Sequence, residues 1–232
     1  LDIFGQSNQD AVSFLSDILG YYADLGSHLD MLHESPLCMG IAHEYDNVYW
    51  VFDGYNESIY RYDFQEDHGP GWDDHSDGVM ARYVEGEVAY EPDVPSHMVL
   101  DSASRLLYIA DTGNNRIAVL DTESGQEGED LVRAEEPGTT HYAMDDAVLS
   151  TFVEGVDFGM VAPSGLEIID GILFVTDNST SEIIAFDMDG QEVDRLYTGI
   201  ESGSLMGIVA RSVEDIWVVS ANENRLYRLQ PR

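Results

Sequence analysis

Apolar and polar residues alternate along much of this chain in short runs bounded by Gly, Asn, Asp and Ser. Four runs show the alternation most clearly, at residues 58–63, 116–121, 182–187 and 225–229. Period-two alternation bounded by turn-forming residues indicates half-buried β-strands, because successive side chains of a strand point to opposite faces. The pattern therefore predicts an all-β protein.

Each of these runs follows a longer segment of common design. The segments cover residues 40–53, 98–111, 165–177 and 207–220. Each contains an apolar strand, a polar turn, and a second strand of aromatic and β-branched residues that ends in Asp or Ser. A fourth strand is expected in the first three repeats, near residues 79–84, 149–153 and 192–197. Four short antiparallel strands that recur along a chain are typical of the blades of a β-propeller.

One repeat carries a family resemblance. The stretch Tyr108-Ile-Ala-Asp-Thr-Gly-Asn-Asn-Arg-Ile-Ala-Val-Leu-Asp121 resembles the core of an NHL repeat. The next repeat keeps Pro163-Ser-Gly-Leu and Phe174-Val-Thr-Asp-Asn, with Glu182 where the family favours Arg. The resemblance covers roughly residues 37–232 and implies a propeller of NHL-like four-stranded blades.

The repeats predict one propeller domain over residues 1–232. Its four visible blades are expected at residues 37–95, 96–162, 163–203 and 204–232. Residues 1–5 fit an outer strand that closes the ring, or the cut edge of a larger ring if the chain is a fragment. Apolar residues at helical spacing in the segment 6–36 predict a helical insertion.

The net charge of the chain limits which binding partners are expected. The chain has 45 Asp and Glu against 10 Lys and Arg, and its formal net charge is -35. Nucleic acid and anionic membrane surfaces would be repelled, so neither is an expected partner. No apolar stretch approaches the roughly 20 residues of a membrane span. The first residue is Leu1 rather than Met, which fits either secretion with signal cleavage or a domain fragment. An extracellular or periplasmic location is therefore expected.

The loop at residues 65–78 holds the densest candidate chemistry. It contains His68, Asp73, Asp74 and His75 around a Gly-Pro-Gly turn. Imidazole together with carboxylate suits zinc or copper, whereas carboxylates alone suit calcium. In a propeller the loops after first and third strands emerge on one face, which also receives His43 and His141. A metal site formed by His43, His68 and His75 follows as a prediction.

A second grouping is expected near the other mouth of the channel. It comprises His33, Cys38 and His97, and His97 stands where the other blades have Gly at the start of the first strand. This position gives a weaker resemblance to the NHL-type lyase that cleaves peptidyl hydroxyglycine, which uses a zinc held by channel histidines. The sequence of His33, Cys38 and Met39 also leaves a copper redox site open.

The sequence contains no phosphate loop, Gly-x-Ser-x-Gly elbow or helical His-Glu-x-x-His motif. The acidic stretch at residues 122–148 is expected to be a solvated face. Together these features favour a binding or scaffold propeller for a protein, peptide or carbohydrate ligand, with a metal site in its loops. The alternative is a metal-dependent lyase or hydrolase, or a copper redox protein. The sequence leaves the oligomeric state open.

Overall fold

A computed structural model of the chain describes residues 34–66, 76–132 and 138–230. These residues form β-strands, nearly all of them paired antiparallel, with a 3-10 turn (Thr112–Asn114) and the short helix α2 (Gly155–Phe158). Neither helical segment has the length or the apolar character needed to cross a membrane. The all-β prediction is confirmed for this part of the chain. The predicted strand at residues 1–5 lies outside it, as does nearly all of the predicted helical insertion at residues 6–36.

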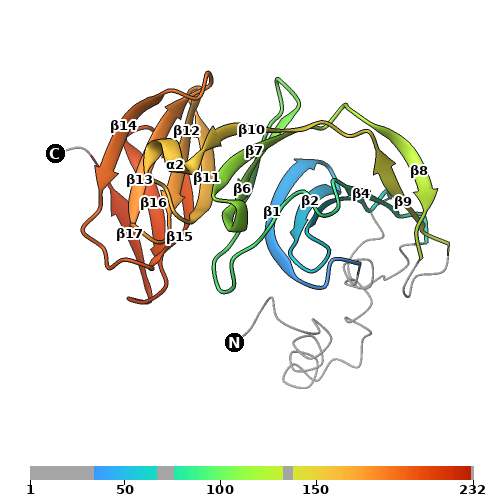
Figure 1. Cartoon of the computed structure of the whole chain (residues 1–232), viewed down its shortest axis with the longest axis horizontal. Coiled ribbons are helices and arrows are strands. Elements are labelled where there is room, and N and C mark those ends of the chain that lie inside the picture. Colours follow the sequence, from blue (N-terminus) through green and yellow to red (C-terminus); the bar gives the residue numbers. More distant parts are fainter. Residues whose placement is uncertain (1–33, 67–75, 133–137, 231–232) are drawn as a thin grey trace. The chain divides into compact units, whose positions relative to one another are not determined.

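The structure divides into two compact units, which are described separately. Unit 1 comprises Leu1–Gly86 and Gly125–Asp146, and unit 2 comprises Glu87–Ser124 and Ala147–Arg232. Figure 1 shows the strands of both units coloured along the sequence.

The described residues of unit 1 form one six-stranded sheet. Its first four strands form an antiparallel meander of β1 (Cys38–Tyr45), β2 (Val48–Asp53), β3 (Ser58–Asp63) and β4 (Val79–Tyr83). The sheet continues through β9 (Thr140–Asp145), which pairs in parallel with β4, and ends at β8 (Gln126–Asp130). The acidic stretch at residues 122–148 is thus partly a hairpin that widens this sheet. Its acidic side chains on β8 are exposed, as the sequence predicts.

Unit 2 contains three sheets, each a run of neighbouring antiparallel strands. The second sheet has the order β10 (Leu149–Glu154), β7 (Arg116–Asp121), β6 (Leu106–Asp111), β5 (Met98–Asp101). The third is β11 (Pro163–Ile169), β12 (Ile172–Asp177), β13 (Glu182–Asp187), β14 (Glu192–Tyr197). The fourth is β15 (Leu205–Ser212), β16 (Asp215–Ser220), β17 (Arg225–Leu229). The four runs that alternate most clearly in the sequence are the strands β3, β7, β13 and β17, so these predictions are confirmed.

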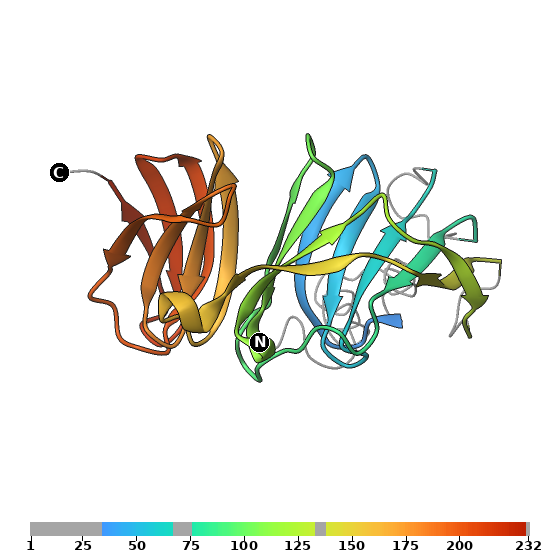
Figure 2. The same cartoon turned by 45° about the horizontal axis from the view of Figure 1, so that its top comes forward.

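The third sheet, β11–β14, packs against a neighbouring sheet on each face of its three inner strands. One face packs against the second sheet through a cluster that includes Leu173, Val175 and Phe186. The other packs against the fourth sheet through a cluster that includes Phe174 and Ile183. Sheets β11–β14 and β15–β17 lie side by side in both views (Figures 1 and 2). Sheets stacked face to face in chain order are the arrangement of consecutive propeller blades.

A buried Asp ends the second strand of the first three sheets. Asp53, Asp111 and Asp177 are each fully buried. Each accepts backbone N–H groups from the segment that leads into its own sheet: Asp53 from Leu37, Asp111 from Ala89, and Asp177 from Val161 and Ala162. Buried carboxylates persist when hydrogen bonds compensate their lost hydration. The repeated Asp is therefore a structural clamp, and Ser220 replaces it in the fourth sheet.

Candidate functional site

Three of the residues predicted for the metal sites lie in the described part of the structure, in two different units. His43 and Cys38 are on β1 in unit 1, and His97 precedes β5 in unit 2. His33, His68, Asp73, Asp74 and His75 lie outside the described residues. Within residues 34–66, 76–132 and 138–230, no three His, Cys, Asp or Glu side chains are grouped so as to hold a metal ion. Both predicted metal sites therefore stay predictions.

His43 occupies a strand end next to a tight turn. Its Nε2 lies 3.1 Å from the carbonyl oxygen of Asp46, and its ring lies 5.2 Å from the ring of Tyr49. The side chain is exposed. These contacts stabilise the β1–β2 turn.

His97 occupies the position that Gly holds in the other sheets. Its carbonyl accepts the N–H of Ala110, the residue before the clamp Asp111. Gly165 pairs with Thr176, which likewise precedes Asp177. The His97 ring lies against Gly207 of β15, with Nε2 3.5 Å from where a Cβ at Gly207 would stand. Burial lowers the pKa of His97, which favours a neutral imidazole at pH 7. The sequence prediction that His97 replaces a repeat Gly is thus confirmed.

Cys38 is a half-buried thiol at the start of β1. Its Sγ contacts the carbonyl oxygen of Gly40 at 3.6 Å. Burial raises the pKa of the thiol to about 11. Because thiolate is the form that binds metals and attacks electrophiles, burial keeps Cys38 in its unreactive thiol form at neutral pH.

A polar pocket lies in unit 1, where the widened sheet meets the turn that joins β2 to β3. It has a volume of about 330 Å³. Its lining comes from the start of the described chain, the β2–β3 turn, the strands β3, β4 and β9, and the residues after β8: Glu34, Pro36, Tyr55, Asn56, Tyr60, Arg82, Leu131, Val132, His141. Cationic, anionic, amide and phenolic side chains thus share one small hollow.

The strand register brings the pocket's three central side chains together. Tyr60 on β3 pairs with Arg82 on β4, and His141 on β9 pairs with Met80, two residues before Arg82 and on the same face of the sheet. The rings of Tyr60 and His141 lie 5.8 Å apart. His141 is almost fully buried, and its Nδ1 lies 2.8 Å from the carbonyl oxygen of Val132 and 3.8 Å from Oε2 of Glu34. Burial raises the pKa of the Tyr60 phenol, and Arg82 opposes this shift.

Arg82 is incompletely paired among the described residues. Its Nη2 lies 2.9 Å from Oε2 of Glu85. Its Nε–H is buried, yet none of the described residues provides an acceptor for it. A buried donor without an acceptor is costly and uncommon in native proteins. The Nε–H is thus closed off from solvent, whereas the Arg82 side chain as a whole is 16% exposed.

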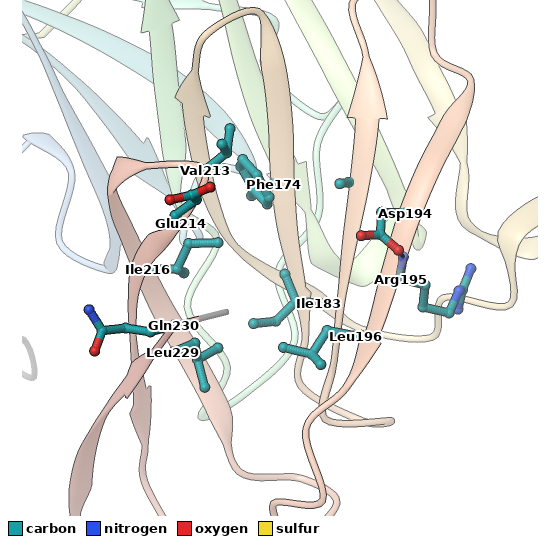
Figure 3. Close-up of a pocket in the computed structure, with 11 residues that line it drawn as sticks. Phe174, Ile183, Asp194, Arg195, Leu196, Val213, Glu214, Ile216, Leu229 and Gln230 are labelled. Atoms are coloured by element: carbon teal, nitrogen blue, oxygen red, sulfur yellow. Dashed lines mark hydrogen bonds between the residues drawn. The ribbon is translucent and has the colours of Figure 1, made fainter. Parts of the chain in front are cut away.

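An apolar groove lies in unit 2 between the third and fourth sheets (Figure 3). Its volume is about 260 Å³. Its apolar lining comes from both sheets, and it carries polar residues at its margin: Phe174, Ile183, Ala185, Leu196, Val213, Ile216 and Leu229, with Asp194, Arg195, Glu214 and Gln230. In Figure 3, Glu214 and Asp194 lie on opposite sides of Phe174.

The repeat pattern does not indicate the residues of these two sites. It places His141 only on one face of the propeller, and Arg82 and Glu34 belong to no motif. The pocket of unit 1 depends on the parallel pairing of β4 with β9. This pairing joins residues about 60 positions apart and has no counterpart in the repeat pattern, so the sequence does not indicate it.

No protein-family model matches the sequence, and no curated protein matches it. Solved structures of similar fold include a chain of a nidogen/laminin complex, with 13% identity, a TM-score of 0.44, and coverage of 84% of this chain and 76% of that chain. A catalytically inactive virginiamycin B lyase from Staphylococcus aureus, solved with quinupristin, has 14% identity, a TM-score of 0.49, and coverage of 84% of this chain and 55% of the lyase. A WD40 β-propeller domain has 8% identity, a TM-score of 0.44, and coverage of 83% of this chain and 64% of that chain.

The lyase and the WD40 chain are thus each spanned over less than two thirds of their length. All of these TM-scores lie below 0.5, so no activity or ligand of those proteins extends to this chain.

Proposed function

We propose that this protein is a binding module with NHL-like repeats, and that the polar pocket of unit 1 holds a neutral carbohydrate. The observation that carries the proposal is the combination of donor and acceptor side chains in the pocket lining, where Arg82 can donate hydrogen bonds and Glu34 can accept them. The hydroxyl groups of a bound ligand would match both.

The mixed chemistry of the pocket supports a hydroxyl-rich ligand. A sugar hydroxyl both donates and accepts, so it can bond to Arg82 as an acceptor and to Glu34 as a donor. Tyr55 adds a flat apolar surface, since 73% of its side chain is exposed beside the pocket. Aromatic residues with a polar end are suited to surfaces where an apolar face and polar groups are recognised together.

Charge argues for a neutral ligand over an anionic one. The chain carries a formal net charge of -35, and Glu34 lies within the pocket. An anion would be repelled at long range by the chain and at short range by Glu34. A neutral sugar avoids both costs.

A glycan array followed by calorimetric titration of any sugar that binds tests the proposal. The Tyr55→Ala variant is expected to weaken binding about tenfold, because it removes the exposed ring beside the pocket. Tyr197→Ala is the matched control, since Tyr197 in unit 2 has the same exposed fraction of 73%. Arg82→Gln should weaken binding further. Failure of all neutral glycans to bind at millimolar concentration, or equal effects of the two tyrosine variants, would contradict the proposal.

The predicted loop metal site and secretion belong to this proposal as expectations from the sequence. His68, Asp73, Asp74 and His75 in one loop support the metal site, with His43 as a further ligand. Elemental analysis of the isolated protein, repeated on a His68→Ala, His75→Ala variant, tests it. A metal-free protein, or an unchanged metal content in the variant, would contradict it.

A further inference from the structure

The residue that ends the second strand is different in the fourth sheet, which is formed by β15, β16 and β17 (Figure 1). In the other three sheets a buried Asp holds this position, and in the fourth sheet Ser220 holds it. The strand register shows the equivalence, because Ser220 pairs with Leu205 as Asp177 pairs with Pro163. The fourth sheet therefore lacks the carboxylate that clamps the other sheets.

The backbone group that this carboxylate binds in the third sheet is still present in the fourth. Asp177 accepts the N–H of Ala162 at 2.9 Å. The Ala162 carbonyl in turn accepts the N–H of the residue that follows Asp177. Ser204 stands in the same place, since its carbonyl accepts the N–H of the residue that follows Ser220. No described residue accepts the N–H of Ser204 itself.

Two buried hydroxyl groups accompany this N–H. Ser204 and Ser220 are each fully buried, and the described residues provide no hydrogen-bond partner for the Oγ of either. A buried polar group without a partner is costly, because nothing compensates its lost hydration. The two hydroxyls and the Ser204 N–H can all donate, so together they match an acceptor.

The fourth sheet also keeps a cationic residue beside this position. Arg225 pairs with Ser220 across β16 and β17, as Arg116 pairs with Asp111 in the second sheet. Arg116 donates to the Asp111 carboxylate at 2.6 Å. Among the described residues no carboxylate lies within salt-bridge distance of Arg225. The fourth sheet thus combines the Arg of the second sheet with an uncharged residue in place of its Asp.

We propose that the fourth sheet binds a chloride-sized monovalent anion in the place that the Asp carboxylate occupies in the other sheets. The anion accepts hydrogen bonds from the Ser204 N–H and from the hydroxyls of Ser204 and Ser220, and Arg225 contributes its positive charge. Hydrogen bonds to an ionised acceptor are stronger than those to a neutral one. A water molecule would satisfy the hydroxyls but would leave the charge of Arg225 unmatched.

The net charge of the chain sets the conditions under which the anion binds. At -35 the chain repels anions at long range. Raising the ionic strength to about 1 M shortens the screening length to about 3 Å, so the donors at the site then act without this repulsion. The site lies in unit 2 and shares no residue with the pocket of unit 1, so it is independent of the carbohydrate proposal.

Thermal unfolding in sodium chloride and in sodium gluconate, each at about 1 M, tests the proposal. Gluconate screens charge equally but is too large for the site, and a ligand that binds only the folded state raises the Tm. The quantity compared is the Tm in chloride minus the Tm in gluconate. Ser220→Asp supplies the carboxylate itself, so this difference should be roughly 2–4 °C smaller in the variant than in the parent.

Ser102→Asp is the matched control, because it adds the same charge at an exposed turn of the same unit. It should keep the difference that the parent shows. Crystals of the parent protein soaked in sodium bromide give a second measurement, which needs no variant. Anomalous scattering should place a bromide within hydrogen-bond distance of the Ser204 and Ser220 hydroxyls. Equal Tm differences in the parent and in Ser220→Asp, or a water and no bromide at the two serines, would overturn the proposal.

Discussion

Nε of Arg116 lies 2.6 Å from Oδ2 of Asp111, a carboxylate that is wholly buried. The same guanidinium donates to the carbonyl of Glu87 at 2.8 Å, so it ties the segment leading into the second sheet to β7. At the equivalent position of the third sheet stands Glu182, which pairs with Arg195 at 2.6 Å and leaves Asp177 to backbone N–H donors. Arg116 and Glu182, which occupy equivalent positions of the repeat, thus stabilise their sheets through different partners.

Replacing Asp111 by Ala is expected to destabilise the protein by about 3–5 kcal/mol, because Arg116 then keeps a largely buried charge without its partner. Asp111→Asn should cost less, since the amide oxygen can still accept the N–H of Ala89. Urea unfolding measures both. Asp170→Asn, at an exposed turn, is the control and should change the free energy of unfolding by less than about 0.5 kcal/mol. An Asp111→Ala protein as stable as this control would refute the clamp.

Two glycines at the same repeat position should respond differently to alanine. A Cβ at Gly165 would stand 2.6 Å from the carbonyl oxygen of Met206 and 2.7 Å from Oγ1 of Thr176. At Gly207 the nearest atom is Nε2 of His97, at 3.5 Å, an ordinary contact. Gly165→Ala should therefore lower the free energy of unfolding by about 1–3 kcal/mol, and Gly207→Ala should have little effect. Equal losses in urea unfolding would show that the strand spacing differs from that described.

Acid should weaken the fold through His97. Burial lowers the pKa of His97 in the folded protein, so the folded state binds its proton less readily than the unfolded chain does. Above the pKa of about 6.5 that His97 has in the unfolded chain, the imidazole is neutral in both the folded and the unfolded state, so it adds no pH dependence. As the pH falls from about 6.5 towards the lower pKa of His97 in the folded protein, the free energy of unfolding decreases. A His97→Gln variant should lack this part of the decline, which urea unfolding from pH 8 to pH 5 measures; parallel curves would contradict the prediction.

Salt should stabilise the protein. The formal net charge of -35 makes the folded state repel itself, and raising ionic strength from about 0.1 M to 1 M shortens the screening length from about 10 Å to about 3 Å. The melting temperature is expected to rise over this range. Sodium and potassium chloride should act alike at equal ionic strength if screening is the cause. A melting temperature that falls with salt would contradict this explanation.

The sequence by itself determined the strands and their grouping in repeats. Alternation located β3, β7, β13 and β17, because a half-buried strand must place every second side chain in the core. Repetition identified the Gly position that His97 fills, and composition alone determined the charge. These features are local or periodic, so short stretches of sequence are enough to predict them.

The tertiary structure alone decided which distant residues meet. The pairing of β4 with β9 brings Tyr60, Arg82 and His141 into one pocket, and the packing of the third sheet on the fourth creates the groove. Such contacts depend on how strands from separate repeats pair and stack, and periodicity does not specify them. The repeat pattern thus determines the strands of each sheet, whereas non-local pairing and packing determine where the pocket and the groove form.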